Sequence, residues 1–217
     1  MNARRSRATP RLLLEPRLKG LYLITPDDGD TTRLVRRVEA VLGSAMLLQY
    51  RNKSAGATLR RAQIAALQPV CRHAGVPLVV NDDWRLARES GVDGAHLGGV
   101  DGDVREARDG LGDVALLGVS CYDDLDRAEA AAAAGASYVA FGAFFPSPTK
   151  PDARPATPRL LRDAGAIGLP RVAIGGITPG NAPMLIEAGA DMIAVISGVF
   201  EAPDPAAAAR AYRACFD

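Results

Sequence analysis

The fold is decided by a recurring unit, Gly135-Ala136-Ser137-Tyr138-Val139-Ala140-Phe141, in which a glycine turn leads directly into an apolar run. The same turn appears as Gly91-Val92-Asp93 and Gly189-Ala190-Asp191, with looser versions at Gly43-Ser44-Ala45 and Gly75-Val76-Pro77. Glycine at this place can adopt the left-handed conformation that ends a helix, and the small residue after it begins the return to a sheet. The unit therefore predicts helices that are each followed directly by a strand.

The spacing of the apolar runs extends this pattern along the chain. Strand-like runs lie near residues 20–25, 45–50, 76–81, 94–97, 114–119, 137–142, 171–175 and 192–196. Helical patterns lie at 32–42, 57–73, 84–90, 104–111, 125–134, 158–164, 180–188 and 205–215. The runs are continuously apolar, as expected of parallel strands that are covered on both faces. We expect a single-domain TIM (β/α)8 barrel over residues 20–217; the alternative, a doubly wound open sheet, lacks a GxGxxG after its first strand.

Composition narrows the class of partner. The chain has 217 residues, 48% of them hydrophobic and 24% charged, and its formal net charge is +1. We therefore expect no nucleic-acid partner, a conclusion that the 5% aromatic content supports. No apolar run reaches the roughly 20 residues that span a bilayer, so we also expect no membrane partner. The sequence is compatible with a homo-oligomer.

Two further features bear on the cellular location. Residues 1–19 are basic, with Glu15 as their only acid, and we expect a flexible arm. A transit peptide is the weaker interpretation of this arm. Cys71, Cys121 and Cys215 are widely separated and form no CxxC, which argues against a disulfide framework or a zinc site. Inert thiols in a reducing cytoplasm are the expectation.

Polar side chains gather directly after the apolar runs. Active sites of TIM barrels lie at the carboxyl ends of the strands, so these clusters should meet at one face. They are Gln49, Arg51 and Lys53; Asn81, Asp82 and Asp83; His96 and Asp101; Ser120; Ser147, Thr149 and Lys150; Gly175 and Gly176; and Ile196, Ser197 and Gly198. Cations, carboxylates and hydroxyls in one place favour a site for a metal-bound polyphosphate.

The carboxylates predict a magnesium site. Asp82 ends one strand and Asp101 follows the next, so the barrel makes them neighbours, and Mg²⁺ typically takes one or two carboxylates plus phosphate oxygens. The alternative is that Asp83 or Asp82 serves instead as the N-cap of the helix that begins near Trp84, a role that suits aspartate. Asp103 could replace Asp101 as a ligand, or cap the next helix instead.

The cations predict an anion. Arg51 and Lys53 are expected to alternate along a strand and to point to one side, where two unpaired charges would need a solvated rim or an anion. Lys150 lies with Ser147 and Thr149 in a proline-stiffened loop.

The glycines point to a second anion. Gly176 and the backbone near Ile196 and Ser197 lie after the last two strands, where phosphate binds in many barrels, although Ser197 could instead be a plain helix cap.

These motifs together resemble the thiamine-phosphate synthase family over residues 20–200. The resemblance rests on Gly20-Leu21-Tyr22-Leu23-Ile24-Thr25, Gln49-Tyr50-Arg51-Asn52-Lys53, Val80-Asn81-Asp82-Asp83, Gly94-Ala95-His96-Leu97-Gly98, Gly118-Val119-Ser120-Cys121, Phe141-Gly142 with Pro146-Ser147-Pro148-Thr149-Lys150, Ile174-Gly175-Gly176-Ile177 and Val195-Ile196-Ser197. Each motif is weak alone, whereas their order and spacing are specific. Where the family usually carries Gln or Glu ahead of its loop aspartate, this chain has Gly99-Val100-Asp101.

The resemblance implies a reaction and a role for each residue. A hydroxymethylpyrimidine pyrophosphate would lose pyrophosphate and leave a pyrimidine cation. The nitrogen of a hydroxyethylthiazole phosphate would then bond to the methylene carbon of that cation, which gives thiamine phosphate. The implied metal ligands for Mg²⁺ are Asp82 and Asp101. The implied pyrophosphate contacts are Arg51, Lys53, Asn81 and Lys150, the pyrimidine contacts are Gln49 and Ser120, and the thiazole phosphate contacts are Ser147, Thr149, Gly176, Ile196 and Ser197. Of these, Arg51, Lys53, Ser120 and Lys150 are expected to act in catalysis.

Three rival functions share this fold. A thiazole tautomerase-like paralogue would lack the full pyrophosphate and metal set. A Schiff-base aldolase would need a buried lysine within a strand, whereas Lys53 and Lys150 follow the apolar runs. A non-catalytic phosphate-binding barrel would have no reason to keep a complete polar ring.

Overall fold

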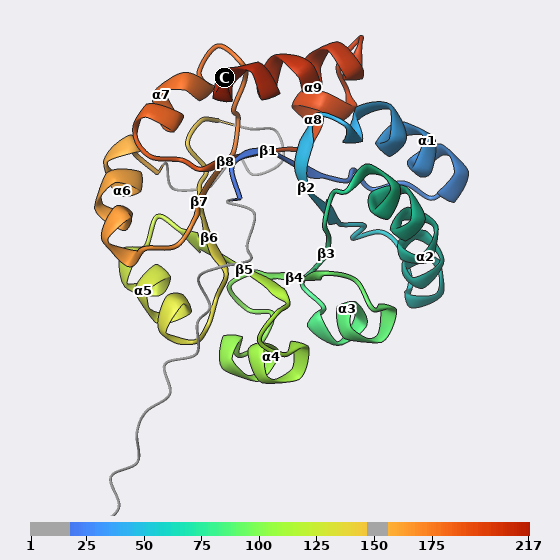
Figure 1. The fold of residues 1–217 in the computed structure, drawn as a ribbon, viewed down its shortest axis with the longest axis horizontal. Helices are drawn as coiled ribbons and strands as arrows, with labels where there is room; N and C mark the ends of the chain where they lie inside the picture. The colour runs from blue at the N-terminus through green and yellow to red at the C-terminus, as the bar shows by residue number, and fades with distance from the viewer. Residues whose placement is uncertain (1–17, 147–155) are drawn as a thin grey trace, which may run out of the picture.

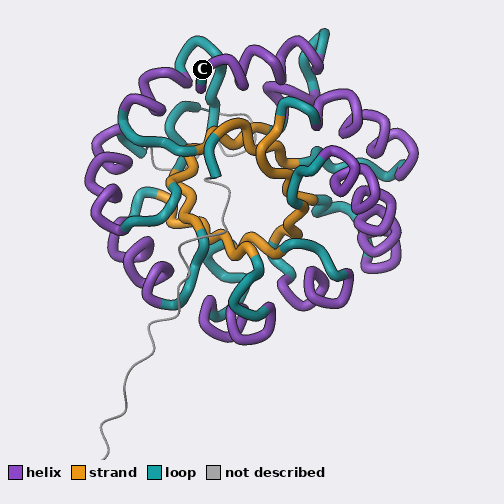
Figure 2. The backbone as a smooth tube through the Cα atoms, viewed as in Figure 1, coloured by secondary structure: helices purple, strands orange, loops and turns teal. Residues whose placement is uncertain are grey.

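The computed structural model describes residues 18–146 and 156–217, and its centre is a closed barrel of eight parallel strands. The strands follow one another around the barrel in chain order, and β1 pairs with β8 to close it. Figures 1 and 2 show the strands as an inner ring with the helices outside it. The strands are β1 (Gly20–Ile24), β2 (Ala45–Tyr50), β3 (Leu78–Asn81), β4 (Gly94–Leu97), β5 (Leu116–Tyr122), β6 (Tyr138–Phe141), β7 (Arg171–Ile174) and β8 (Met192–Val195). The predicted TIM barrel is confirmed.

Helices connect successive strands and cover the outside of the ring. They are α1 (Thr31–Leu42), α2 (Ala57–Ala74), α3 (Trp84–Ser90), α4 (Val104–Leu111), α5 (Leu125–Ala133), α6 (Pro158–Asp163), α7 (Ala182–Glu187), α8 (Ser197–Phe200) and α9 (Pro205–Arg213), with 3₁₀ turns at Ala164–Ile167 and Ala214–Phe216. Helix α7 begins two residues later than predicted. The side chain of Asn181 bonds to the Thr178 amide and the Gly176 carbonyl, and so holds the residues before the helix in a turn.

The recurring glycine turns tie neighbouring strands together at the amino ends. In three of these turns the side chain of the third residue accepts a hydrogen bond from a backbone amide at the beginning of the preceding strand. The pairs are Asp93 with Leu78 (2.8 Å), Ser137 with Leu117 (3.1 Å) and Asp191 with Arg171 (2.9 Å). The unit that predicted the fold therefore also fixes the strands in pairs.

Hydrophobic side chains form two layers. The larger layer lies between the strands and the helices, and the smaller one fills the barrel, where Tyr22, Leu47, Tyr138 and Met192 are buried. Leu18, at the end of the predicted arm, is buried in the inner layer, whereas residues 1–17 of that arm lie outside the described part of the chain.

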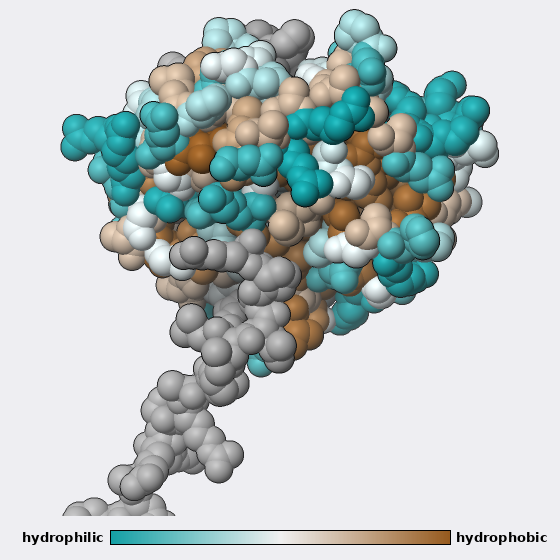
Figure 3. All heavy atoms as spheres, turned by 45° about the horizontal axis from the view of Figure 1, so that its top comes forward, coloured by the Kyte–Doolittle hydropathy of each residue, from teal (hydrophilic) through white to brown (hydrophobic). Residues whose placement is uncertain are grey.

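The outer surface mixes polar and apolar side chains. In Figure 3 hydrophilic residues are spread over the visible face, with hydrophobic ones between them. Across residues 18–146 and 156–217, no helix has both the length and the apolar character that crossing a membrane requires.

A buried arginine joins α4 to the next two strands. Arg108 donates to the carbonyls of Gly112, Ala115 and Gly135 and to the Ser137 hydroxyl, at 2.7–3.0 Å. A buried guanidinium is tolerated only when its donors are used, and four oxygen acceptors surround this one. Arg108 is therefore a structural residue at the end of the barrel opposite the polar clusters.

Candidate active site

A cavity of about 880 Å³ opens at the carboxyl ends of the strands. The sequence-predicted residues that line it are Gln49, Arg51, Lys53, Asn81, Asp82, Asp101, Ser120, Gly176, Ile196 and Ser197. The other three predicted residues, Ser147, Thr149 and Lys150, lie outside the described residues. The barrel thus brings every described member of the predicted site into one cavity.

Two carboxylates meet on one side of this cavity. Asp82 follows β3 with a positive φ of 66°, and its amide donates to the His96 carbonyl at 2.7 Å. Asp101 accepts a hydrogen bond from the Gly98 amide at 2.7 Å. Burial raises the pKa of Asp82, and a hydrogen bond and the charge of Asp101 raise it further, against the lowering effect of Lys53 and Arg51. The two carboxyl groups therefore repel each other unless a proton or a cation lies between them.

The neighbouring aspartates have structural roles. Asp83 caps α3 by accepting from the Leu86 amide at 2.9 Å, and Asp103 caps α4 by accepting from the Glu106 amide at 2.9 Å. The cap prediction for Asp83 is confirmed, and Asp101 rather than Asp103 is the loop aspartate beside Asp82. Among the described residues, no group of three or more His, Cys, Asp or Glu side chains could hold a metal ion.

The cations follow β2 instead of lying on it. The strand ends at Tyr50, so the predicted alternation of Arg51 and Lys53 along a strand is wrong. Beyond the strand, the Thr25 hydroxyl takes up both backbone groups of Arg51, accepting from its amide and donating to its carbonyl at 2.8 Å each. Both side chains still line the cavity.

Each of these cations also has a carboxylate partner. Arg51 pairs with Asp27 at 3.0 Å, and the Lys53 ammonium lies 3.9 Å from Asp82. The same Asp27 oxygen accepts from the Lys53 amide at 3.0 Å and so ties the loop after β1 to the loop after β2. Both charges therefore have a carboxylate beside them, and the Lys53 side chain is also 60% exposed at the rim.

The charges that line the described part of the cavity do not balance. Two cations, Arg51 and Lys53, face three carboxylates, Asp82, Asp101 and Asp123. A polyphosphate would therefore need further positive charge to bind here.

A chain of polar side chains crosses the floor of the cavity. Gln49 donates to the Tyr22 hydroxyl, which is 2.8 Å from the Tyr138 hydroxyl, and His96 links Tyr138 (3.2 Å) to Ser120 (2.9 Å). Burial lowers the pKa of His96 to about 4, so its imidazole is neutral at physiological pH. Burial likewise raises the pKa of Tyr22 and Tyr138, so both phenols keep their protons.

Gly176 is required by a neighbouring loop. Its φ is +60°, and a β-carbon here would overlap the Pro146 carbonyl and the Phe145 side chain. A larger residue would therefore displace the chain after β6 before it could affect a bound anion. Ile196 is the N-cap of α8 and Ser197 its first residue, so the alternative of Ser197 as a helix cap is wrong.

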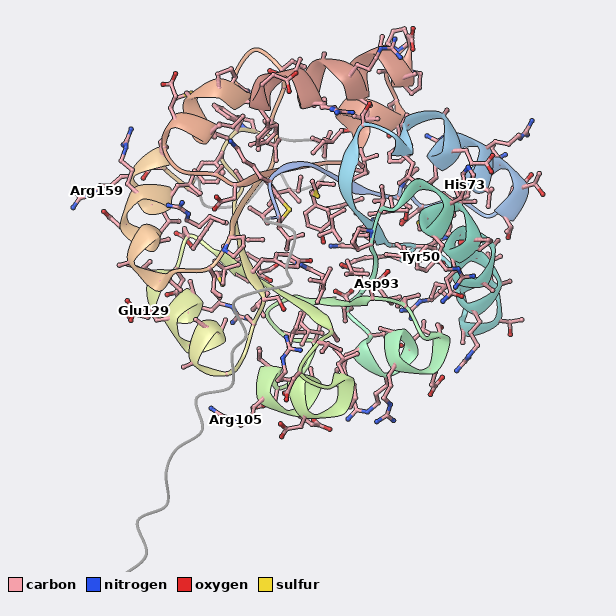
Figure 4. The ribbon with its side chains drawn as sticks, viewed as in Figure 1. Tyr50, His73, Asp93, Arg105, Glu129 and Arg159 are labelled. Atoms are coloured by element: carbon pink, nitrogen blue, oxygen red, sulfur yellow. The ribbon has the colours of Figure 1, made fainter. Side chains whose placement is uncertain are left out.

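The thiols and the second histidine take no part in this site. Cys71 and Cys121 are buried, and burial raises the pKa of each to about 12. Cys215 is partly exposed. His73 lies on the outside of α2, away from the barrel axis (Figure 4).

Sequence reasoning missed three residues of this region and gave a fourth no role. The missed residues are Tyr22 and Tyr122, which line the cavity, and Asp27, which holds Arg51; His96 was expected at this face and lines the cavity, but no function was predicted for it. Tyr22 and His96 stood inside the motifs that carried the family resemblance, and Asp27 follows a strand as the predicted carboxylates do. These signals were present, but nothing local shows that the tyrosine and histidine side chains point inward.

Comparisons with known proteins agree with this geometry. The family model described as thiamine monophosphate synthase matches residues 21–199. A curated thiamine-phosphate synthase of Xanthomonas campestris pv. campestris is 59% identical over 91% of this chain and 96% of that relative. One from Chromobacterium violaceum is 54% identical, over 94% of this chain and 99% of that relative. Thiamine phosphate pyrophosphorylase from Pyrococcus furiosus superposes with a TM-score of 0.81 at 31% identity, over 92% of this chain and 96% of that one.

Proposed function

Because the chain belongs to the thiamine monophosphate synthase family, we propose that its cavity joins a hydroxymethylpyrimidine pyrophosphate to a hydroxyethylthiazole phosphate. The products would be thiamine phosphate and pyrophosphate. The activity is that of a transferase of thiamine biosynthesis, as in the curated thiamine-phosphate synthases. We propose that the enzyme acts in the cytoplasm, because the three free cysteines of this chain suit a reducing compartment.

The observation that carries this proposal is the pair of adjacent carboxylates in a cavity with too little positive charge. Asp82 and Asp101 offer hard oxygen ligands, and their mutual repulsion would be relieved by a divalent cation. These residues fit Mg²⁺, because that ion commonly takes one or two carboxylates and completes its shell with water and phosphate oxygens. When bound, Mg²⁺ would neutralise charge on the pyrophosphate.

The residues beside these carboxylates would hold the leaving group. Arg51 can grip a phosphate with two donors, and Lys53 adds a mobile point charge. Asn81 contributes an amide at the end of β3. Fixed positive charge would favour the separated pyrophosphate more than the intact substrate, so these contacts would speed the breaking of the carbon–oxygen bond.

The floor of the cavity would hold the pyrimidine. Gln49 and Ser120 lie there and offer neutral hydrogen-bonding groups, which suit an uncharged ring better than a phosphate. The ring would keep its methylene carbon toward Arg51 and Lys53 while pyrophosphate leaves. The nitrogen of the thiazole would then attack that carbon, and no nucleophile from the protein is needed.

The opposite rim would hold the thiazole phosphate. Ile196 and Ser197 stand at the beginning of α8, where the first amides of a helix have no partner within the helix. Gly176 lies beside them along the cavity wall. Ser147 and Thr149 would add hydroxyl donors, and Lys150 would add a cation toward the pyrophosphate.

A Schiff-base aldolase is disfavoured by the position of Lys53. Its side chain is 60% exposed and pairs with Asp82, whereas an amine that attacks a carbonyl is normally desolvated. The tautomerase-like and non-catalytic alternatives differ from the proposal in that neither would couple the two precursors into thiamine phosphate.

The test is to mix purified protein with both phosphorylated precursors and Mg²⁺ and to detect thiamine phosphate by fluorescence after oxidation. We expect product that requires both precursors and stops on addition of EDTA. Product formation that persists in EDTA would overturn the metal assignment. Binding of the thiazole phosphate without any coupled product would instead support the tautomerase-like or non-catalytic alternative.

A further inference from the structure

Five buried or half-buried side chains form one hydrogen-bonded line from Gln49 to Ser120. The line runs through Tyr22, Tyr138 and His96, which come from β1, β6 and β4. Tyr138 lies behind the cavity wall, and Gly118 leaves room for its ring, because a β-carbon at Gly118 would overlap it. The two ends of the line face the cavity.

The line has a direction, which follows from counting protons. Gln49 donates to Tyr22 through Nε2 at 2.5 Å, so the Tyr22 hydroxyl must give its own proton onward to Tyr138. In the reverse arrangement, with Tyr138 donating to Tyr22, the buried Tyr22 proton would have no acceptor in the line, which is unfavourable for a buried donor.

The direction continues to the other end. Tyr138 then donates to Nδ1 of a neutral His96, and Nε2–H of that imidazole donates to Ser120.

This direction fixes what the two ends offer to a ligand. The Ser120 oxygen already accepts from His96, so its own proton is available to donate into the cavity. Nε2 of Gln49 is engaged with Tyr22, so its carbonyl oxygen is available as an acceptor. If the Gln49 amide turned over, every bond in the line would have to reverse and His96 would have to change tautomer. The two ends are therefore coupled.

We propose that Tyr22, Tyr138 and His96 are positioning residues that hold Gln49 as an acceptor and Ser120 as a donor, and thereby select an aminopyrimidine over its oxo counterpart. The inference rests on the proposed function, since it concerns the pyrimidine of that reaction. An amine donates and its neighbouring ring nitrogen accepts, which matches the two ends. The oxo form presents a carbonyl and a ring N–H, with both polarities reversed.

The experiment compares two probes, 4-amino-5-hydroxymethyl-2-methylpyrimidine and its 4-oxo counterpart, by calorimetry. The wild-type protein should prefer the amino probe by about 100-fold or more, because a site built around hydrogen bonds rejects ligands of the wrong polarity. Tyr138→Phe removes the hydroxyl that bonds both Tyr22 and His96, so the orientation of Gln49 no longer depends on that of Ser120. It should reduce the preference by at least about tenfold, mainly through tighter binding of the oxo probe.

Tyr50→Phe is the matched control. Tyr50 is also a buried tyrosine whose hydroxyl bonds a glutamine, Gln63 at 2.8 Å, but it lies toward α2 on the outside of the barrel (Figure 4). The Tyr50→Phe variant should be destabilised about as much as Tyr138→Phe and should keep the wild-type preference for the amino probe. Tyr22→Phe, which cuts the line nearer Gln49, serves if Tyr138→Phe fails to fold.

The outcomes separate the two proposals. A wild-type protein that makes thiamine phosphate, together with Tyr138→Phe and Tyr22→Phe variants that keep the full preference, would overturn the positioning role alone. If the wild-type protein makes no product, and the Tyr138→Phe variant loses the preference for the amino probe, the proposed function is overturned and the positioning role is supported. A purely structural role predicts a lower melting temperature with an unchanged ratio, which also overturns the inference.

Discussion

Asp82 and Asp101, from the loops after neighbouring strands, lie together at one side of the cavity, close enough for Asp101 to raise the pKa of Asp82. Asp82 does so from a left-handed backbone conformation that aspartate and asparagine tolerate better than most residues. The arrangement destabilises the ligand-free protein, because burial and like charge both oppose ionisation of Asp82. A cation bound between the two carboxylates would relieve this repulsion and raise the free energy of unfolding.

Asp82→Asn should therefore stabilise the ligand-free protein while it abolishes activity. The pKa of Asp82 in the folded state is raised above its unfolded value of 3.8, so its stabilising contribution is present below pH 3.8 and is lost as the pH rises through the folded pKa. The variant should melt at a higher temperature than wild type at pH 7, and the gap should close toward pH 3.8. Added Mg²⁺ should raise the melting temperature of wild type only.

Asp83→Asn is the control for this prediction. It removes the adjacent charge but keeps the cap of α3, since asparagine caps helices as well as aspartate. It should retain activity and the response to Mg²⁺. An Asp82→Asn protein that is stabilised by Mg²⁺ as much as wild type would contradict the metal assignment.

Lys150→Ala should lower kcat/KM by roughly 100- to 1000-fold, or about 2.7–4 kcal/mol, the loss expected for one preorganised charge. The described lining of the cavity has two cations against three carboxylates, so a further cation has a large effect on a leaving pyrophosphate. Steady-state kinetics with saturating Mg²⁺ measures it. Unchanged kcat/KM would remove Lys150 from the site.

Cys121→Ala should keep activity within a few-fold of wild type. Cys121 follows Ser120 directly, but it is buried and its pKa is raised to about 12, so it carries no thiolate at neutral pH. Thiol labelling of the native protein should accordingly reach Cys215 before Cys71 or Cys121. Full inactivation of the variant with an intact fold would require a different mechanism.

Arg108→Met should destabilise the protein by about 3 kcal/mol without changing kcat, because it leaves three partly buried carbonyls, far from the cavity, without their donor. For a chain of this length the melting temperature should fall by roughly 6–12 °C. Arg105→Met is the matched control on the same helix, since Arg105 points away from the barrel (Figure 4) and its contact with the Ala133 carbonyl is exposed. Equal melting temperatures for the two variants would contradict the role of Arg108.

Much of the fold and of the candidate site was predictable because the relevant signals are local. A glycine that ends a helix and an apolar run that follows it each report on a few consecutive residues. Eight apolar runs that alternate with helical patterns leave few arrangements besides a barrel. Once the barrel is assumed, any polar residue directly after a strand belongs to the same face. Gln49, Asn81, Asp82 and Ser120 were placed in the cavity on that ground alone.

The tertiary structure decided which atoms meet, because those pairs come from parts of the chain far apart in sequence. Tyr22 and Tyr138 are 116 residues apart, and their hydroxyls touch only because the register around the closed barrel directs both rings to the same interior level. The pairing of Arg51 with Asp27 likewise depends on where β2 ends and how the loop after β1 returns. Sequence periodicity specifies that a side chain is buried or exposed; its partner is specified by strand register and barrel closure, which no local pattern encodes.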